Sequence, residues 1–479
     1  MEGLLAAAIL VALGLTLWQF RDIGYLPQPF LYDLNYPLMG LYDTAYWANH
    51  SGAYELGRSF YPPLSFVFLR LFTIHSCYGM NPFGGRDCDW LARWVIFGFY
   101  VLNGGLVYRC FRKQDPATAL PRAVAMWLGL PMLYGLECTN LIIVSFSFFV
   151  LGYGGLVRSA PLRWLALGLS INFKPYLLVL LVPPSLRRQW RWLLGCAAVG
   201  ALIYLLTYAM EGGGSPVQLI SNLRLYAADV AHKYWSDVYY GTSYWPLVNL
   251  MTWQFQLLGF ASPHSGDAWR LVFIILIRGT QLAATICLVF AAFRPEAVNV
   301  RRFAALIIAV ILTTITTGQS GYVQIFLFFL LFFEPFRGPV RITVLVTTYL
   351  LSIPADFTLL PVIHAPAWSY LGGRQVVADF GLSLGQLLRP AGLLIIQFGL
   401  IILNLNDLLH SGEAPEAHNC VGGLESVAAP SQRAALTPAS RTLPLEQRLP
   451  LLRLALQRPA SNDKFPALTA RAQSGVDIS

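Results

Sequence analysis

Long apolar blocks dominate the first 405 residues of the chain and alternate with polar loops that carry most of the charges. The blocks are about 17 to 24 residues long, which is the length that an α-helix needs to cross a hydrocarbon core of about 30 Å. This pattern predicts an all-α fold, a polytopic membrane bundle of about 10 to 13 transmembrane helices. The expected spans are residues 3–20, 91–109, 120–136, 139–157, 192–209, 270–293, 303–318, 321–336, 339–355 and 385–405.

One apolar segment, residues 163–187, is interrupted by Asn172, Lys174 and Pro175, so it is either one kinked span or a hairpin of two short helices. Loops dense in Lys and Arg resist translocation and mark the cytoplasmic side of a membrane. Five such loops fall on one side only if 163–187 turns back, and we therefore expect the hairpin, with Lys174 near its apex. These loops are residues 109–113, 158–163, 187–191, 294–302 and 337–341.

The loops 21–90, 210–269 and 356–384 then lie on the opposite, outer face, and they are rich in Tyr, Trp and Phe. They contain apolar stretches at 61–74 and 246–260 that are too short to span, and segments of this kind tend to lie in the membrane interface. Three large interfacial loops above a helical bundle predict a site that is reached from both membrane and water.

The pattern changes at the C-terminus, so we expect a membrane domain over 1–405 and a cytoplasmic, mostly disordered tail over 406–479. From Ser411 the chain is rich in Ala, Pro, Ser, Leu and Arg, without a sustained apolar run. The stretch 443–456 is either part of this solvated tail, which we favour, or a short amphipathic helix on the membrane. We read the first apolar run, residues 3–20, as a retained helix because it lacks a basic n-region and a cleavage site.

Composition supports a membrane protein and excludes other classes. The chain is 56% hydrophobic and 12% charged, whereas soluble domains carry about 25% charged residues. The net charge of +9 comes from Lys and Arg at the ends of apolar blocks rather than on one basic face, which argues against nucleic-acid binding. The seven cysteines form no CxxC pair and no HExxH is present, so no zinc site is expected. Cys77 and Cys88, close together in one outer loop, are either a disulfide or two thiols.

The first outer loop carries the candidate acids, Asp33 and Asp43, each followed three residues later by a tyrosine, Tyr36 and Tyr46. A carboxylate at the water face above a lipid-accessible cavity can take a proton from a sugar hydroxyl. The alternative is that these aspartates solvate the loop or cap a short helix. The loop ends in Tyr61-Pro62-Pro63-Leu64, where the proline pair forces a turn at the start of an apolar helix.

Lys174 is the second candidate, because an ammonium buried in an apolar hairpin is costly and intramembrane ionisable groups are functional by default. Its natural partner would be a phosphate. The alternative is that the long side chain extends to the interface.

In their order along the chain, these motifs resemble those of GT-C glycosyltransferases, and most closely bacterial polyprenyl-phosphate-mannose-dependent mannosyltransferases. The resemblance covers about residues 1–405 and rests on short motifs: a first-loop aspartate, then Tyr-Pro-Pro-Leu from Tyr61, Thr-Asn-Leu at 139–141, Gly-Leu-Ser-Ile-Asn-Phe-Lys-Pro-Tyr at 168–176, and Arg-Arg-x-x-Arg-Trp at 187–192. It implies that the first loop supplies the catalytic aspartate. Spacing to Tyr54 and Tyr61 favours Asp33, with Asp43 as the alternative.

The resemblance also implies a substrate-binding set near the donor phosphate, namely Lys174, Tyr61, Tyr176 and Asn140. It does not extend to residues 316–322, where Gly321 stands in place of a histidine found in many relatives. The implied function is transfer of a mannose-like hexose from a polyprenyl-phosphate sugar to a lipid or glycan acceptor, at the outer face of the inner (plasma) membrane. Besides membrane lipids and these substrates, no partner or cofactor is expected, although a loop aspartate could also hold a divalent ion.

Two other functions stay open. A transporter or flippase for lipid-linked saccharides would place ionisable groups along a path through several spans, yet most spans here carry almost none. A polysaccharide polymerase or ligase would rely on arginines in the outer loops. Those available are Arg58, Arg70, Arg86, Arg93, Arg224 and Arg374.

Overall fold

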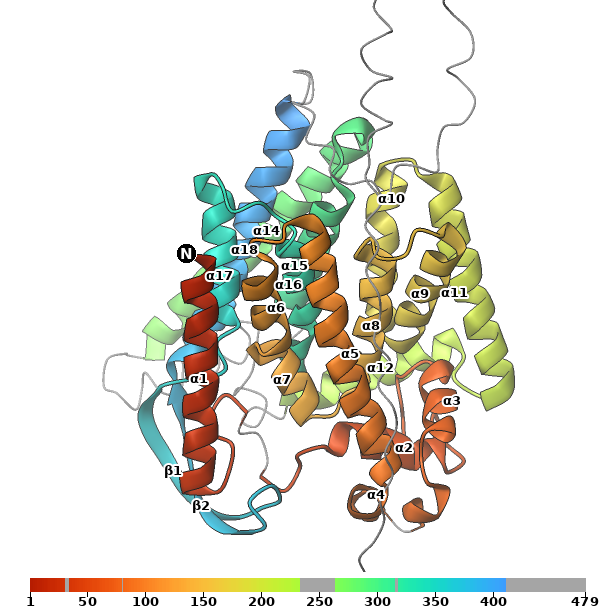
Figure 1. Cartoon of the computed structure of the whole chain (residues 1–479), viewed down its shortest axis with the longest axis vertical. Helices are drawn as coiled ribbons and strands as arrows, with labels where there is room; N and C mark the ends of the chain where they lie inside the picture. The colour runs from red at the N-terminus through yellow and green to blue at the C-terminus, as the bar shows by residue number, and fades with distance from the viewer. Residues whose placement is uncertain (31–33, 80, 233–262, 315–317, 411–479) are drawn as a thin grey trace, which may run out of the picture. The chain divides into compact units, whose positions relative to one another are not determined.

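The computed structural model describes residues 1–30, 34–79, 81–232, 263–314 and 318–410, and confirms an all-α polytopic helical bundle (Figure 1). Among these residues, six helical segments are long and apolar enough to cross a membrane. They are α1 (Glu2–Ile23), α5 (Trp90–Gln114), α6 (Ala119–Trp127) with α7 (Leu130–Glu137), α11 (Trp190–Glu211), α14 (Pro263–Phe293) and α18 (Leu384–His410).

Shorter apolar helices account for the remaining expected spans. Residues 139–157 and 321–336 contain shorter helices than expected, and the last span continues to His410. These helices are α8 (Ile142–Tyr153), α9 (Ala160–Phe173), η2 (Pro175–Leu181), α10 (Val182–Leu186), α15 (Val300–Thr314), η5 (Gly318–Val323), α16 (Gln324–Leu331) and α17 (Pro339–Leu351).

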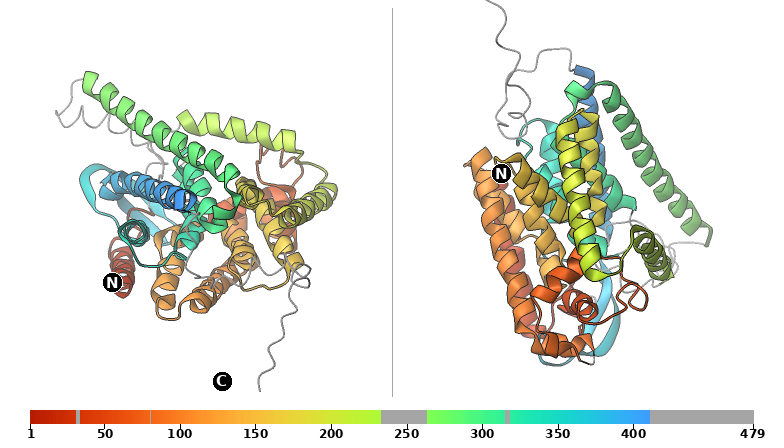
Figure 2. Two further views of the ribbon diagram at one scale, coloured as in Figure 1. Left: turned by 90° about the horizontal axis from the view of Figure 1, so that it is seen from above. Right: turned by 90° about the vertical axis from the view of Figure 1, so that its right-hand side faces the viewer.

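The bundle exposes apolar side chains on its outside, as a helix facing lipid must. α1 lies at one edge and α11 at the other in both the side view and the view from above (Figure 2). On α11, Leu194 is 64% exposed and Leu205 is 62% exposed. A soluble protein of this size would cover such a face with polar groups, so the chain is a membrane protein.

The basic loops meet at one end of the bundle, which we call the basic end (loops 109–113, 155–163, 187–191, 294–302 and 334–341). Lys113 Nζ donates to Gly155 O at 2.6 Å, Arg301 Nη2 to Tyr153 O at 3.2 Å, and Arg187 Nη1 to Val298 O at 3.4 Å. The hairpin over 163–187 is therefore confirmed, because α9 leaves this end and α10 returns to it.

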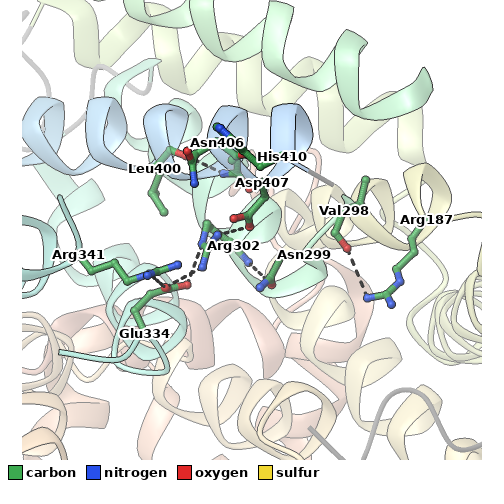
Figure 3. A network of polar contacts seen from close by, with 11 residues as sticks. Arg187, Val298, Asn299, Arg302, Glu334, Arg341, Leu400, Asn406, Asp407 and His410 are labelled. Atoms are coloured by element: carbon green, nitrogen blue, oxygen red, sulfur yellow. Dashed lines mark hydrogen bonds and ion pairs between the residues drawn. The ribbon is translucent and has the colours of Figure 1, made fainter. Parts of the chain in front are cut away.

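Carboxylates balance part of the charge at the basic end (Figure 3). Arg302 donates to Glu334 at 2.9 and 2.8 Å and also binds Asp407, while Arg341 donates to Glu334 at 3.2 Å. This network joins α15, the end of α16, α17 and α18. Charges buried in this way are stable because each meets an opposite charge.

The large loops lie at the opposite end, the loop end, where Figure 1 shows the helices of the first loop on one side and a two-stranded sheet on the other. The first loop forms α2 (Met39–Ala48), α3 (Pro63–Leu71), η1 (His75–Tyr78) and α4 (Pro82–Cys88), and the second forms α12 (Pro216–His232). The expected turn before the short apolar helix is present, since Pro62 precedes α3 and Pro63 is its first residue. Residues 246–260 and 443–456 lie outside the described residues.

The sheet between α17 and α18 was not predicted. β1 (Thr358–Ser369) pairs antiparallel with β2 (Arg374–Ser383), and Gly373 in the turn has a φ of +60°. The hairpin docks on the first loop, because Ser369 Oγ donates to Gly24 O at 2.6 Å and Tyr370 N donates to Leu34 O at 2.9 Å. These partners are more than 300 residues apart, so no local sequence pattern announces them.

Two further contacts shape the loop end. Cys77 and Cys88 form a disulfide that closes the segment leading into α5. Asp89 caps α5 by accepting a hydrogen bond from Ala92 N at 3.1 Å, and it also accepts one from Tyr78 Oη at 2.8 Å. The end of the first loop is therefore fixed both covalently and by a capping carboxylate.

Candidate functional site

Lys174 lies where the membrane hairpin bends. Pro175 disfavours a helical conformation for the residue before it, so α9 ends at Phe173 and Lys174 is extended, with φ −136° and ψ 92°. The arm leading to it is held against α11 because Gly168 and Gly200 allow their backbones to approach closely. Asn172 strengthens this packing by donating to Gly200 O at 2.9 Å. The three residues that interrupt the apolar segment thus build and position the bend.

The Lys174 ammonium meets aromatic and neutral polar groups. Its Nζ lies 3.4 Å from Tyr61 Oη and 4.5 Å from the centre of the Tyr61 ring, and 5.9 Å from the centre of the Tyr322 ring. Lys174 is only 6% exposed, and no carboxylate within the described ranges pairs with it. Cation–π contacts offset part of the cost of burying the charge, which leaves an ammonium able to bind an anion.

Asn140 joins the tyrosines of this cluster. Its Nδ2 donates to Tyr61 Oη at 3.3 Å and to Tyr322 Oη at 3.2 Å, while its Oδ1 accepts from Ile142 N at 3.0 Å. Burial raises the pKa of Tyr61 to about 12, against the hydrogen bonds from Asn140 and Thr44. The Tyr61 hydroxyl therefore stays protonated at neutral pH and serves as a polar ligand group rather than as a base.

Tyr176 follows Lys174 by two residues and packs edge-on against Phe326, with ring centres 6.3 Å apart. Its hydroxyl is buried and makes no hydrogen bond in the described structure. An unsatisfied buried hydroxyl costs about 1–3 kcal/mol. Such a cost is easiest to understand where a ligand or water completes the site.

Asp43 lies on α2 and borders this cluster. Gly40, one turn earlier on α2, packs directly on the Cys138 backbone and next to the Asn140 side chain, so α2 rests on the turn that carries Asn140. The Tyr36 hydroxyl hydrogen-bonds Asp43. Burial raises the pKa of Asp43 to about 6, against the lowering effect of the Arg86 charge. The charge of Asp43 also raises the pKa of Tyr61, so the acid and the tyrosine that contacts Lys174 belong to one electrostatic environment.

The structure joins three of the six predicted site residues by direct contacts: Tyr61, Asn140 and Lys174. A fourth, Asp43, lies on α2, which packs next to Asn140. Tyr176 is next to Lys174 in the chain and acts electrostatically on the same tyrosine. Asp33 lies outside the described residues. Tyr54 supports the loop, since its hydroxyl donates to Tyr61 O at 3.2 Å.

Two residues of the site were missed by the sequence analysis. Tyr322 belongs to a segment to which the family resemblance assigns no part, yet it hydrogen-bonds Asn140. Glu137 ends α7 three residues before Asn140, accepts a hydrogen bond from Cys138 Sγ at 3.2 Å, and forms no ion pair among the residues described. An acidic residue at the end of an apolar helix, just before the Thr-Asn-Leu motif, was the signal that could have identified it.

No group of three or more His, Cys, Asp or Glu side chains that could hold a metal comes together in the described part of the chain. Comparison with protein-family models, with curated proteins and with solved structures finds no match to this chain. The fold and the site define the class of protein. It is a polytopic helical membrane protein whose loop end holds both the acid Asp43 and a buried lysine, Lys174, without a carboxylate partner among the described residues.

Proposed function

We propose that the protein is a membrane glycosyltransferase that moves a mannose-like hexose from a polyprenyl-phosphate sugar to an acceptor hydroxyl at the outer face of the inner (plasma) membrane. The observation that carries this proposal is the buried Lys174 ammonium, which lacks a carboxylate partner in the described structure and contacts Tyr61 of the first loop. A lipid phosphate would supply the missing negative charge.

The reaction follows from the two charges. Asp43, or Asp33, takes the proton of the acceptor hydroxyl as the hydroxyl oxygen attacks the anomeric carbon. The bond between the anomeric carbon and the phosphate oxygen breaks with inversion, and its electron pair leaves with the lipid phosphate. Lys174 stabilises the charge that develops on that phosphate, while Asn140 fixes the Tyr61 hydroxyl that contacts the ammonium.

The test is sugar transfer by purified protein in lipid nanodiscs, with polyprenyl-phosphate mannose as donor, for the wild type and for Asp33→Asn, Asp43→Asn and Lys174→Ala. Asp22→Asn is the matched control, because Asp22 is an exposed acid at the end of α1, where the same loop begins. Loss of transfer in Lys174→Ala and in one aspartate variant, with Asp22→Asn unaffected, supports the proposal. Full activity in all three site variants would refute the site, and absence of transfer by the wild type with any polyprenyl-phosphate hexose would refute the function.

A further inference from the structure

Arg86 is an arginine of α4 that is buried although it lies in a loop at the membrane surface. It is 3% exposed. Its Nη1 donates to Asn35 O at 2.6 Å and to Pro37 O at 3.3 Å, and its guanidinium lies 3.5 Å from the centre of the Tyr370 ring. One side chain thus joins three parts of the chain: the start of the first loop, α4 and the β-hairpin.

The two carbonyls that Arg86 holds flank Tyr36, and the Tyr36 hydroxyl bonds the Asp43 carboxylate. The Tyr36 ring also packs edge-on against Phe83 of α4, with ring centres 6.4 Å apart. Since a side chain cannot be placed more firmly than its own backbone, Arg86 and Phe83 together decide where the Tyr36 hydroxyl lies.

Arg86 is itself anchored. Its helix, α4, ends at Cys88, which is bonded to Cys77. Arg93 of α5 donates to the Arg86 backbone carbonyl at 2.5 Å. The backbone that carries the guanidinium is therefore fixed, as it must be in a residue that orients others.

We propose that Arg86 is a positioning residue for the acid of the site: it holds the backbone on both sides of Tyr36 and so keeps the Tyr36 hydroxyl against Asp43. This inference rests on the proposed function for its effect on sugar transfer, but the link between Arg86 and Asp43 does not depend on it. Arg86 touches no reacting atom, and its effect passes through Tyr36 and through its charge.

The segments packed on α2 carry further charged and titratable groups. They are Asp87 on α4, which pairs with Arg86 at 3.6 Å, Arg70 on α3, Glu137 and Cys138 at the end of α7, and Tyr36 and Tyr61 in the first loop. Of the cations, Arg70 donates to Ala48 O at 2.7 Å at the far end of α2 and pairs with Glu211 at 2.9 Å. Arg86 is the cation that acts on Asp43 and opposes the effect of burial on its pKa.

The experiment measures when Asp43 is protonated, without using activity. Carbodiimides react faster with a carboxyl group when it is protonated, and mass spectrometry of the Asp43 peptide gives the extent of labelling between about pH 4 and about pH 8, each value compared with the wild type at the same pH. In Arg86→Gln we expect labelling to persist to higher pH, by about one pH unit, because a nearby positive charge has been removed. In the pH profile of sugar transfer, the rising limb should move to higher pH by a similar amount.

Arg70→Gln is the matched control, since it removes a guanidinium that bonds the α2 backbone away from Asp43, and it should leave the labelling curve unchanged. Where Arg86→Gln yields no folded protein, Tyr36→Phe tests the same series of contacts. It should also shift the labelling curve of Asp43 to higher pH, because the carboxylate loses a hydrogen-bond donor. Curves that coincide with the wild type in the folded variants overturn the proposal. A labelling curve that shifts in a protein that transfers no sugar would support the link between Arg86 and Asp43 and refute the proposed function.

Discussion

Replacing Lys174 with methionine should separate function from stability. The substitution keeps a flexible side chain of similar length and removes the ammonium, which within the described ranges hydrogen-bonds Tyr61 Oη at 3.4 Å. Loss of the charge that faces the leaving phosphate should lower kcat/KM for the lipid-phosphate donor by about 10²- to 10³-fold, the usual effect of removing one group that stabilises developing charge.

The stability of the same variant should stay level or rise. An ammonium that is 6% exposed and has no carboxylate partner in the described ranges costs free energy to bury. The two cation–π contacts offset this cost by about 0.5–2 kcal/mol. We therefore expect Lys174→Met to unfold with a free energy within about 1 kcal/mol of the wild type, or above it.

The assay pairs donor titrations in nanodiscs with thermal unfolding of the same preparations. Lys113→Met is the control, because Lys113 donates to Gly155 O at 2.6 Å at the basic end, away from the site. It should lose no transfer. A Lys174→Met protein that keeps more than a tenth of wild-type transfer, or that unfolds far more easily than the wild type, would refute the reasoning.

Four further predictions follow from individual contacts. Asn140→Leu removes the amide that bonds Tyr61 and Tyr322 at 3.3 and 3.2 Å and should cost about 1–3 kcal/mol in unfolding free energy as well as most of the transfer; unchanged stability would contradict this. Glu137→Gln removes a carboxylate without an ion-pair partner in the described structure and should lower transfer at least about tenfold without lowering the melting temperature; a less stable, fully active variant would show a structural role. Glu2→Gln breaks a buried pair with Arg122 at 2.8 Å and should cost about 3–5 kcal/mol, part of which Arg122→Met should restore in the double variant; a neutral single variant would refute it. If Asp43 is the base, transfer should rise with pH through about 6, because its pKa is raised to about that value and only the ionised form accepts a proton; a flat profile from about pH 5 to about pH 8 would exclude Asp43 as the base.

The bundle and the hairpin could be predicted because their signals are local. A span is identified by its own length and apolarity, and the turn at Lys174 follows from Pro175 and from basic loops that must share one side. The grouping of Lys174, Tyr61 and Asn140 was predictable only through the order of motifs in a known family. No spacing rule joins Lys174 to Tyr61, which lie 113 residues apart.

What could not be predicted depends on partners distant in the chain. The β-hairpin occupies a loop that the sequence analysis described only as aromatic and interfacial, and it docks on Gly24 and Leu34, far away in the chain. In the sequence, Arg86 is one of several arginines in the predicted outer loops. Its contact with the Tyr370 ring depends on how the fold brings α4 and the β-hairpin together. The disulfide of Cys77 with Cys88 was one of two open alternatives, because spacing alone does not set the geometry that a bond needs.

Buried charges in this molecule differ in whether they meet an opposite charge, and this contrast is the physical basis for placing the site. Arg122 pairs with Glu2 and Arg302 pairs with Glu334. Lys174 is 6% exposed and forms no ion pair with a described residue. The attraction between paired charges offsets the free-energy cost of burying them, so no ligand is needed to stabilise them. A charge left without a partner persists where a ligand provides one, so the loop end is where a phosphate and a sugar should bind.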